Sequence, residues 1–168
     1  VYLKTNFNVS EARYSWLPTT NALMVVFLQV FITRLTRQKA PTKVLPIGAL
    51  FYAASMLIIA LGNSYTTFWA AMVVMTIGEM IIAPTATVYV TSLAPENQRG
   101  RYLGVFGLTW NIAMSIGPLS AGILTDNIGM RAPYFFGMGI GILSMFAFLA
   151  LDRFAQRSAA QPDLREIS

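Results

Sequence analysis

Long apolar stretches alternate with short polar segments along most of this chain. A hydrocarbon core about 30 Å thick needs roughly 20 residues of helix at about 1.5 Å per residue, and five stretches meet this requirement. The predicted transmembrane helices are residues 16–33, 44–61, 65–90, 102–124 and 132–151. Polar segments rich in Gly, Pro, Asn and charged residues separate them. The pattern therefore predicts an all-α integral membrane protein with a five-helix transmembrane region over residues 16–151.

The composition fits a membrane protein and provides few residues suited to catalysis. Of the 168 residues, 55% are hydrophobic and 11% are charged, whereas soluble domains carry roughly 25% charged residues. The chain has no Cys and no His, which excludes disulfides and removes the commonest metal ligand and general base. Paired carboxylates and nucleophile–base sets are also lacking. We predict that the protein is not an enzyme and uses neither a cofactor nor a metal.

The basic residues are distributed unevenly between the two sides of the predicted helix bundle. The first loop, the third loop and the C-terminal segment hold nine of the twelve Lys and Arg. Because Lys and Arg concentrate on the cytoplasmic side, we predict a cytoplasmic tail at 152–168 and an extracytoplasmic segment at 1–15. The same bias explains the net charge of +5, so we predict no nucleic-acid partner. The residues interpreted as cytoplasmic loop charges are Arg34, Arg37, Arg99 and Arg101.

The N-terminal residues VYLKTNFNVSEARYS lack the initiator Met, basic leader and cleavage site of a signal peptide. An extracytoplasmic start without a signal sequence is difficult to reconcile with membrane insertion. We therefore expect either that the chain was processed or that it is a piece of something longer.

The predicted helices differ in how many polar side chains they carry. The first, third and fourth contain several Thr, Asn, Gln or Glu residues, whereas the second and fifth have little beyond single Ser and Tyr hydroxyls. Polar groups inside a bilayer cost free energy unless they face protein or water. We therefore expect the first, third and fourth helices to line the interior and the other two to lie nearer lipid.

Glu79 is the only charged residue between Tyr65 and Val90. It lies about 21 Å along the helix from Tyr65 at about 1.5 Å per residue, and a charge at mid-bilayer costs roughly 2.5–3.5 kcal/mol. Desolvation favours the protonated carboxyl, and a carboxyl that gains and loses a proton suits a proton-coupled cycle. We interpret Glu79 as the proton- or cation-coupling group. The alternative is a neutral Glu79 that bonds a neighbouring helix for structural reasons only.

Internal prolines in the third and fourth predicted helices mark candidate bends. Pro118 removes one backbone hydrogen bond from the fourth helix, and Gly117 and Gly122 allow movement around it. Pro84, five residues after Glu79, has the same effect in the third helix. We interpret these prolines and glycines as gating positions, with tight helix packing alone as the alternative.

Other intramembrane side chains are candidates for the wall of a substrate cavity. They are Gln29, Thr76, Asn111 and Trp110. The polar groups have the alternative of bonding a neighbouring helix, and Trp110 has that of marking the membrane edge. Gly137 and Gly141 form a small-xxx-small pair, which indicates either dimerisation or packing within one chain.

A family resemblance extends over nearly the whole chain and is clearest in GEMIIAPTATVYVTSLAPENQRGRYLGVFGLTWNIAMSIGPLSAGIL, residues 78–124. Its motifs are a Gly-Glu pair followed by Pro84, LAP at 93–95, an RG turn at 99–100 and GPxxxG at 117–122. This order and spacing resembles the second half of major facilitator superfamily transporters, particularly the drug–proton antiporters. The antiporter signature GPxxGG belongs to the fifth helix of that family, and residues 113–122 resemble its repeat-related counterpart with Ala121 in place of one Gly.

The resemblance implies that the five predicted helices are helices eight to twelve of a six-plus-six bundle. It implies that helices eight, ten and eleven surround a central cavity. We therefore predict the C-terminal part of a secondary active transporter that couples protons to efflux of small hydrophobic or cationic compounds by alternating access. The expected partners are a small-molecule substrate, protons, the bilayer and a missing N-terminal half. The alternatives are proton-coupled uptake of a peptide or sugar, and a non-transporting membrane scaffold subunit.

Overall fold

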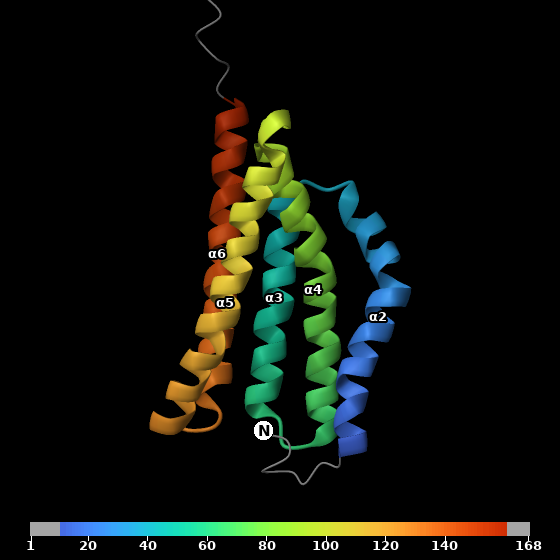
Figure 1. Cartoon of the computed structure of the whole chain (residues 1–168), viewed down its shortest axis with the longest axis vertical. Coiled ribbons are helices and arrows are strands. Elements are labelled where there is room, and N and C mark those ends of the chain that lie inside the picture. The colour runs from blue at the N-terminus through green and yellow to red at the C-terminus, as the bar shows by residue number, and fades with distance from the viewer. Residues whose placement is uncertain (1–10, 161–168) are drawn as a thin grey trace, which may run out of the picture.

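The computed structural model describes residues 11–160, and all of the described regular structure is helical (Figure 1). The elements are α2 (Glu11–Arg37), α3 (Pro41–Leu61), α4 (Tyr65–Leu93), the short 3₁₀ turn η1 (Glu96–Gln98), α5 (Arg99–Asn127) and α6 (Ala132–Ala160). The five α-helices are long and apolar enough to cross a membrane. The predicted fold class, an all-α integral membrane bundle, is confirmed.

Each α-helix contains one predicted span. α2 and α5 extend beyond the span at both ends, α4 and α6 at the C-terminal end only, and α3 at the N-terminal end only. α2 begins at Glu11, within the segment expected to be extracytoplasmic, and residues 1–10 lie outside the described part of the chain. α6 continues to Ala160, so the first residues of the predicted tail are helical. That stretch, DRFAQRSAA, has no Gly or Pro and is rich in helix formers. The rest of the tail, 161–168, also lies outside the described residues.

α3 is the central helix of the described bundle and packs against both α4 and α6 (Figure 1). Glycines make these close approaches possible. A Cβ atom added to Gly78 of α4 would lie 3.1 Å from the carbonyl oxygen of Gly48 in α3. A Cβ added to Gly141 of α6 would lie 2.9 Å from the Cβ of Ala53 and 3.0 Å from its Cα. In this structure Gly141 therefore packs within the chain.

From polarity, the second and fifth helices are expected to lie nearer lipid than the first, third and fourth. Within the described bundle this is wrong for the second helix, α3, whereas the fifth, α6, is largely exposed. That the first, third and fourth helices line a cavity stays a prediction. α3 is the most buried helix, whereas the described residues of α2 and α5 include no buried position. Apolar surface gains little by moving from lipid to protein, so close packing of small side chains decides which helices meet. α3 supplies such a surface. Its small buried residues are Gly48, Ala49, Ala53, Ser55 and Ala60.

Most of the described basic residues lie at one end of the bundle. α2, α4 and α6 end there, and α3 and α5 begin there (Figure 1). This end holds Arg34, Arg37, Lys39, Lys43, Arg99, Arg101, Arg153 and Arg157. The hydroxyl of Thr42 donates a 2.6 Å hydrogen bond to Asp152 Oδ1 and joins α3 to α6 at the same end. We call it the basic end below.

Candidate functional site between α2 and α4

Glu79 lies half-buried on α4 and accepts a hydrogen bond from α2. The Nδ2 of Asn21 lies 3.2 Å from Glu79 Oε2 and 2.9 Å from Thr76 Oγ1. An amide NH₂ has two hydrogens, so Asn21 can donate to both oxygens at once. Thr76 is completely buried and donates its own hydroxyl hydrogen to the carbonyl of Met72, at 2.8 Å. The carboxyl is therefore part of a polar link between two membrane-spanning helices.

A second polar link between α2 and α4 involves the proline that follows Glu79. Pro84 has no N–H, so the carbonyl of Met80, four residues earlier, loses its partner within the helix. The Nε2 of Gln29 donates to that carbonyl at 3.2 Å and to Thr33 Oγ1 at 3.0 Å. Gln29 thus supplies from α2 the hydrogen bond that Pro84 removes from α4. An unpaired carbonyl in a membrane interior would be costly, which gives this contact a structural reason.

Replacing Gln29 with Leu is expected to lower the free energy of unfolding by about 0.5–1.5 kcal/mol, the range of interhelical hydrogen bonds in membranes. The loss should shrink in a Pro84→Ala background, because an alanine N–H satisfies the Met80 carbonyl within α4. The four proteins of this double-mutant cycle can be compared by unfolding in mixed micelles. Gln38→Leu, at an exposed position beyond α2, is the control. Equal losses with and without the Pro84→Ala substitution would show that Gln29 does not act through this carbonyl.

An aromatic pocket lies between α2 and α4 towards the end opposite the basic end. Its volume is about 540 Å³, and its lining residues are Trp16, Thr20, Tyr65, Thr66 and Trp69. The indole Nε1 of Trp69 donates to Thr20 Oγ1 at 3.2 Å. Trp69 precedes Glu79 by ten residues, or about 15 Å along α4. The pocket, Asn21, Glu79 and Gln29 therefore follow one another along the same helix pair.

The structure brings together some of the predicted site residues and separates others. Glu79, Thr76 and Gln29 lie at the α2–α4 contact, as described above. Asn111 and Trp110 are exposed on α5, where the amide of Asn111 donates to the carbonyl of Gly107 in its own helix at 3.0 Å. They make no described contact with the Glu79 site and remain predictions for a cavity wall.

The two glycines among the predicted bending positions on α5 have open space where a side chain would point. A Cβ atom added to Gly117 or Gly122 would meet nothing within 4 Å. Pro118 lies inside the helix and leaves the carbonyl of Met114 without its usual partner. Packing among the described helices therefore does not explain these glycines, and gating at Pro118 remains a prediction.

The four predicted loop charges lie at the basic end, with Arg34 and Arg37 in the last turn of α2 and Arg99 and Arg101 in the first turn of α5.

Sequence reasoning does not single out Asn21, which is one of several polar residues in its helix. The signal it offers is an amide within a membrane span. Without the register between α2 and α4, that signal does not identify Glu79 as its partner.

These helices and the intramembrane polar link between them define the class of protein, a multi-pass integral membrane protein. The chain belongs to the Major Facilitator Superfamily, whose family model matches residues 1–165. This result confirms the family predicted from the motifs around Glu79 and Pro118.

The chain is similar to several members of this family. It is 30% identical over 129 residues to the uncharacterized MFS-type transporter YttB of Bacillus subtilis (strain 168), covering 76% of this chain and 32% of YttB. It is 31% identical over 140 residues to a Na(+), Li(+), K(+)/H(+) antiporter of Planococcus maritimus, covering 83% of this chain and 31% of the antiporter. It is 20% identical over 144 residues to the riboflavin transporter RibZ of Clostridioides difficile (strain 630), covering 86% and 32%.

The chain spans about a third of the length of these three relatives. No solved structure matches it.

Proposed function

We propose that this chain is the C-terminal part of a secondary active transporter that moves protons in exchange for small hydrophobic or cationic compounds. The observation that carries the proposal is the contact between Glu79 and Asn21, which places a titratable group between two membrane-spanning helices. Family membership supports transport as the general activity. The aromatic pocket on the same helix pair supports the substrate class, because Trp and Tyr rings bind both apolar groups and cations.

The coupling follows from the chemistry of the carboxyl. When Glu79 is ionised, the hydrogen bond from Asn21 is charge-assisted and roughly twice as strong as a neutral one. When Glu79 is protonated, this bond weakens and the carboxyl gains a donor hydrogen that competes for other acceptors. Proton binding therefore loosens the link between α2 and α4, and proton release tightens it. The strength of this contact between α2 and α4 thus depends on whether Glu79 is protonated. Such a contact favours one conformation of the transporter when a proton is bound and another when it is released, as alternating access requires.

The proposed topology has the basic end in the cytoplasm, together with the C-terminal tail. The concentration of Lys and Arg at that end supports this orientation. The N-terminal half of the transporter would cover the exposed face of α5 that carries Asn111 and Ser115. Each of these exposed side chains makes one hydrogen bond to a carbonyl of its own helix. The remaining amide hydrogen and oxygen of Asn111 still need partners, so a water-lined cavity or a neighbouring helix would suit that face better than lipid does.

A second candidate is exchange of alkali cations for protons at the same carboxyl. The similarity to the Planococcus maritimus antiporter favours it, and so does the grouping of oxygen atoms from Glu79 and Thr76 around Asn21. Oxygen ligands suit hard cations. In this version Na⁺ and H⁺ would compete for Glu79, and the aromatic pocket would have no transport role.

A flux experiment tests these proposals. The complete transporter is reconstituted in proteoliposomes, a pH gradient is imposed, and the movements of a hydrophobic cationic dye and of Na⁺ are recorded. Drug–proton exchange predicts dye movement opposite to the proton flux, and the second candidate predicts the same for Na⁺ alone. Movement of a solute in the same direction as protons would support uptake. Gradient-independent behaviour of both solutes would support a non-transporting scaffold.

A further inference from the structure

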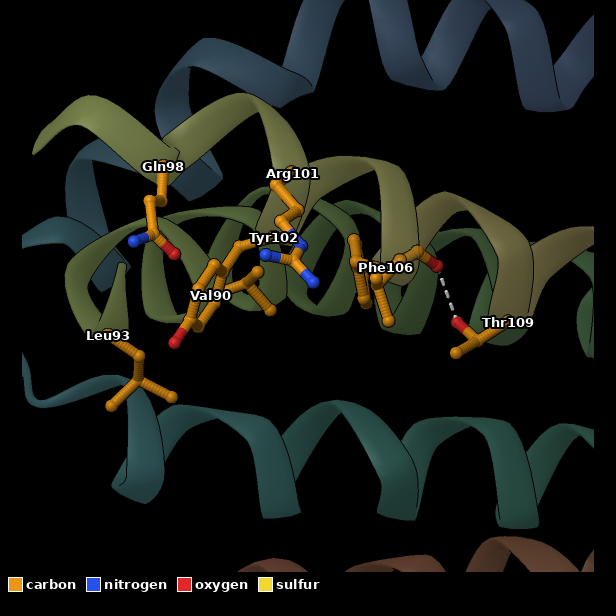
Figure 2. A pocket seen from close by; sticks show the side chains of 8 residues that line it. Val90, Leu93, Gln98, Arg101, Tyr102, Phe106 and Thr109 are labelled. Atoms are coloured by element: carbon orange, nitrogen blue, oxygen red, sulfur yellow. Dashed lines mark hydrogen bonds between the residues drawn. The ribbon is translucent and has the colours of Figure 1, made fainter. Parts of the chain in front are cut away.

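A pocket of about 630 Å³ lies at the basic end, between the last turn of α4 and the first turns of α5 (Figure 2). Its lining residues are Val90, Leu93, Gln98, Arg101, Tyr102, Val105, Phe106 and Thr109. It is separate from the Glu79 site and shares no residue with the aromatic pocket. A volume of this size is typical of small-molecule sites, which range over about 300–1,000 Å³.

The polarity of the pocket changes along its length. Gln98 and Arg101 stand at the outer end, next to the turn that joins α4 to α5. Val90, Val105 and Phe106 form an apolar wall further in. Thr109 lies eight residues beyond Arg101, or about 12 Å deeper at about 1.5 Å per residue. The hydroxyl of Thr109 donates to the carbonyl of Phe106 in its own helix. The pocket therefore runs inward from the basic end, with its one charged group near the outer end and a mostly apolar wall further in.

The guanidinium of Arg101 is available to a ligand. Figure 2 shows its side chain reaching into the space between α5 and α4, among the other lining residues. Within the described part of the chain no hydrogen bond or ion pair is recorded for Arg101. A guanidinium matches a phosphate with two parallel hydrogen bonds, and the side-chain amide of Gln98 offers further donors.

We propose that this pocket binds one anionic phospholipid of the cytoplasmic leaflet. The phosphate lies against Arg101 and Gln98, and an acyl chain follows the wall formed by Val90, Val105 and Phe106. Basic pockets between transmembrane helices on the cytoplasmic side suit anionic head groups, and this leaflet is rich in them. A soluble phosphate would leave the apolar wall without a partner. A zwitterionic phospholipid offers the same phosphate, but its ammonium group offsets that charge beside Arg101, whereas an anionic phospholipid keeps a net negative charge there. The inference rests on the proposed orientation and not on the proposed transport activity.

Lipid retention measured by native mass spectrometry tests this proposal on the complete protein in detergent micelles. The protein is titrated with phosphatidylglycerol and phosphatidylethanolamine in equal amounts. Wild type should retain one tightly held phosphatidylglycerol, and Arg101→Ala should weaken that retention roughly tenfold, as expected for loss of a charge-assisted contact. Arg101→Lys should keep part of it. Arg99→Ala is the matched control, since it removes the same charge from the same helical turn without touching the pocket.

Three results would overturn the proposal. Equal losses in Arg101→Ala and Arg99→Ala would mean that lipid follows the general surface charge. Unchanged retention in Arg101→Ala would mean that the pocket is covered or empty in the complete protein. Displacement of phosphatidylglycerol by millimolar inorganic phosphate would mean that the site recognises a soluble anion. Since Arg101 is exposed, its replacement should not prevent folding, and an unchanged melting temperature verifies this.

Discussion

Replacing Glu79 with Gln is expected to abolish the response of transport to an imposed pH gradient while the protein remains folded. Gln has nearly the same shape and still accepts a hydrogen bond from Asn21 through its amide oxygen, but it cannot ionise. The charge-assisted form of the contact, which contributes roughly 1.5–3 kcal/mol against about 0.5–1.5 kcal/mol for a neutral bond, is therefore lost. The difference of about 1–1.5 kcal/mol between the two forms corresponds to roughly five- to tenfold, so gradient-driven flux should fall by about that factor.

The measurement is the initial rate of dye or Na⁺ movement in proteoliposomes with and without the pH gradient. Glu96→Gln makes the same chemical change at an exposed position of η1, at the basic end of the bundle, and it should leave the rate unchanged. A Glu79→Gln protein that transports like wild type at every gradient would remove the coupling role. Glu79 would then serve only to hold α2 against α4 through Asn21.

Replacing Gly141 with Leu is expected to cause a larger loss of stability than any other substitution proposed above. The new side chain would begin at a Cβ atom 2.9 Å from Ala53 Cβ and 3.1 Å from the Ala53 backbone nitrogen. Helix backbone cannot move aside as a flexible side chain can, so α6 must separate from α3. Overpacking of this kind typically costs about 1–3 kcal/mol. Because α3 is the central helix, the whole bundle should be affected.

Gly139→Leu is the control for this substitution. It makes the same change two residues away on the same helix, but a Cβ atom at Gly139 meets nothing within 4 Å. Thermal unfolding followed by tryptophan fluorescence should show a lower melting temperature for Gly141→Leu and a nearly unchanged one for Gly139→Leu. If the two variants melted alike, close packing at Gly141 would not limit the stability of the α3–α6 interface. If Gly141→Leu changed only the oligomeric state, Gly141 would serve contacts between chains instead.

At the site, the sequence indicates Glu79 as a functional residue but does not indicate which residues it contacts. A lone carboxylate in an apolar segment is a functional candidate from the sequence alone, because the free-energy cost of burying an ion in lipid does not depend on knowing its neighbours. Asn21 has no such signal, since its partner is 58 residues away in the chain. The same limit applies to Gln29. Pro84 indicates in advance that the Met80 carbonyl is unpaired, but the register of α2 against α4 decides which side chain reaches it.

The sequence likewise predicts which segments form membrane-length helices but not which helices pack against each other. Polarity along the sequence does not predict which helix is central, because α3 has almost no polar residues and is nevertheless the most buried of the described helices. In an apolar solvent, hydrophobicity determines that a helix enters the membrane but not which neighbour it meets. The contacts of Gly78 with α3 and of Gly141 with α3 depend on shape. A glycine in the sequence indicates where approach is possible, and the partner is known only from the packed structure.

The sequence by itself determined the five membrane-length helices, the family and the position of Glu79 within an apolar helix, because these depend on the transfer of each segment from water to lipid and on local motifs. The tertiary structure alone decided that α3 is central, that Asn21 and Gln29 join α2 to α4, and that Arg101 faces a pocket. These features arise where residues far apart in the chain meet, and the order of residues within one helix does not specify the helix opposite it.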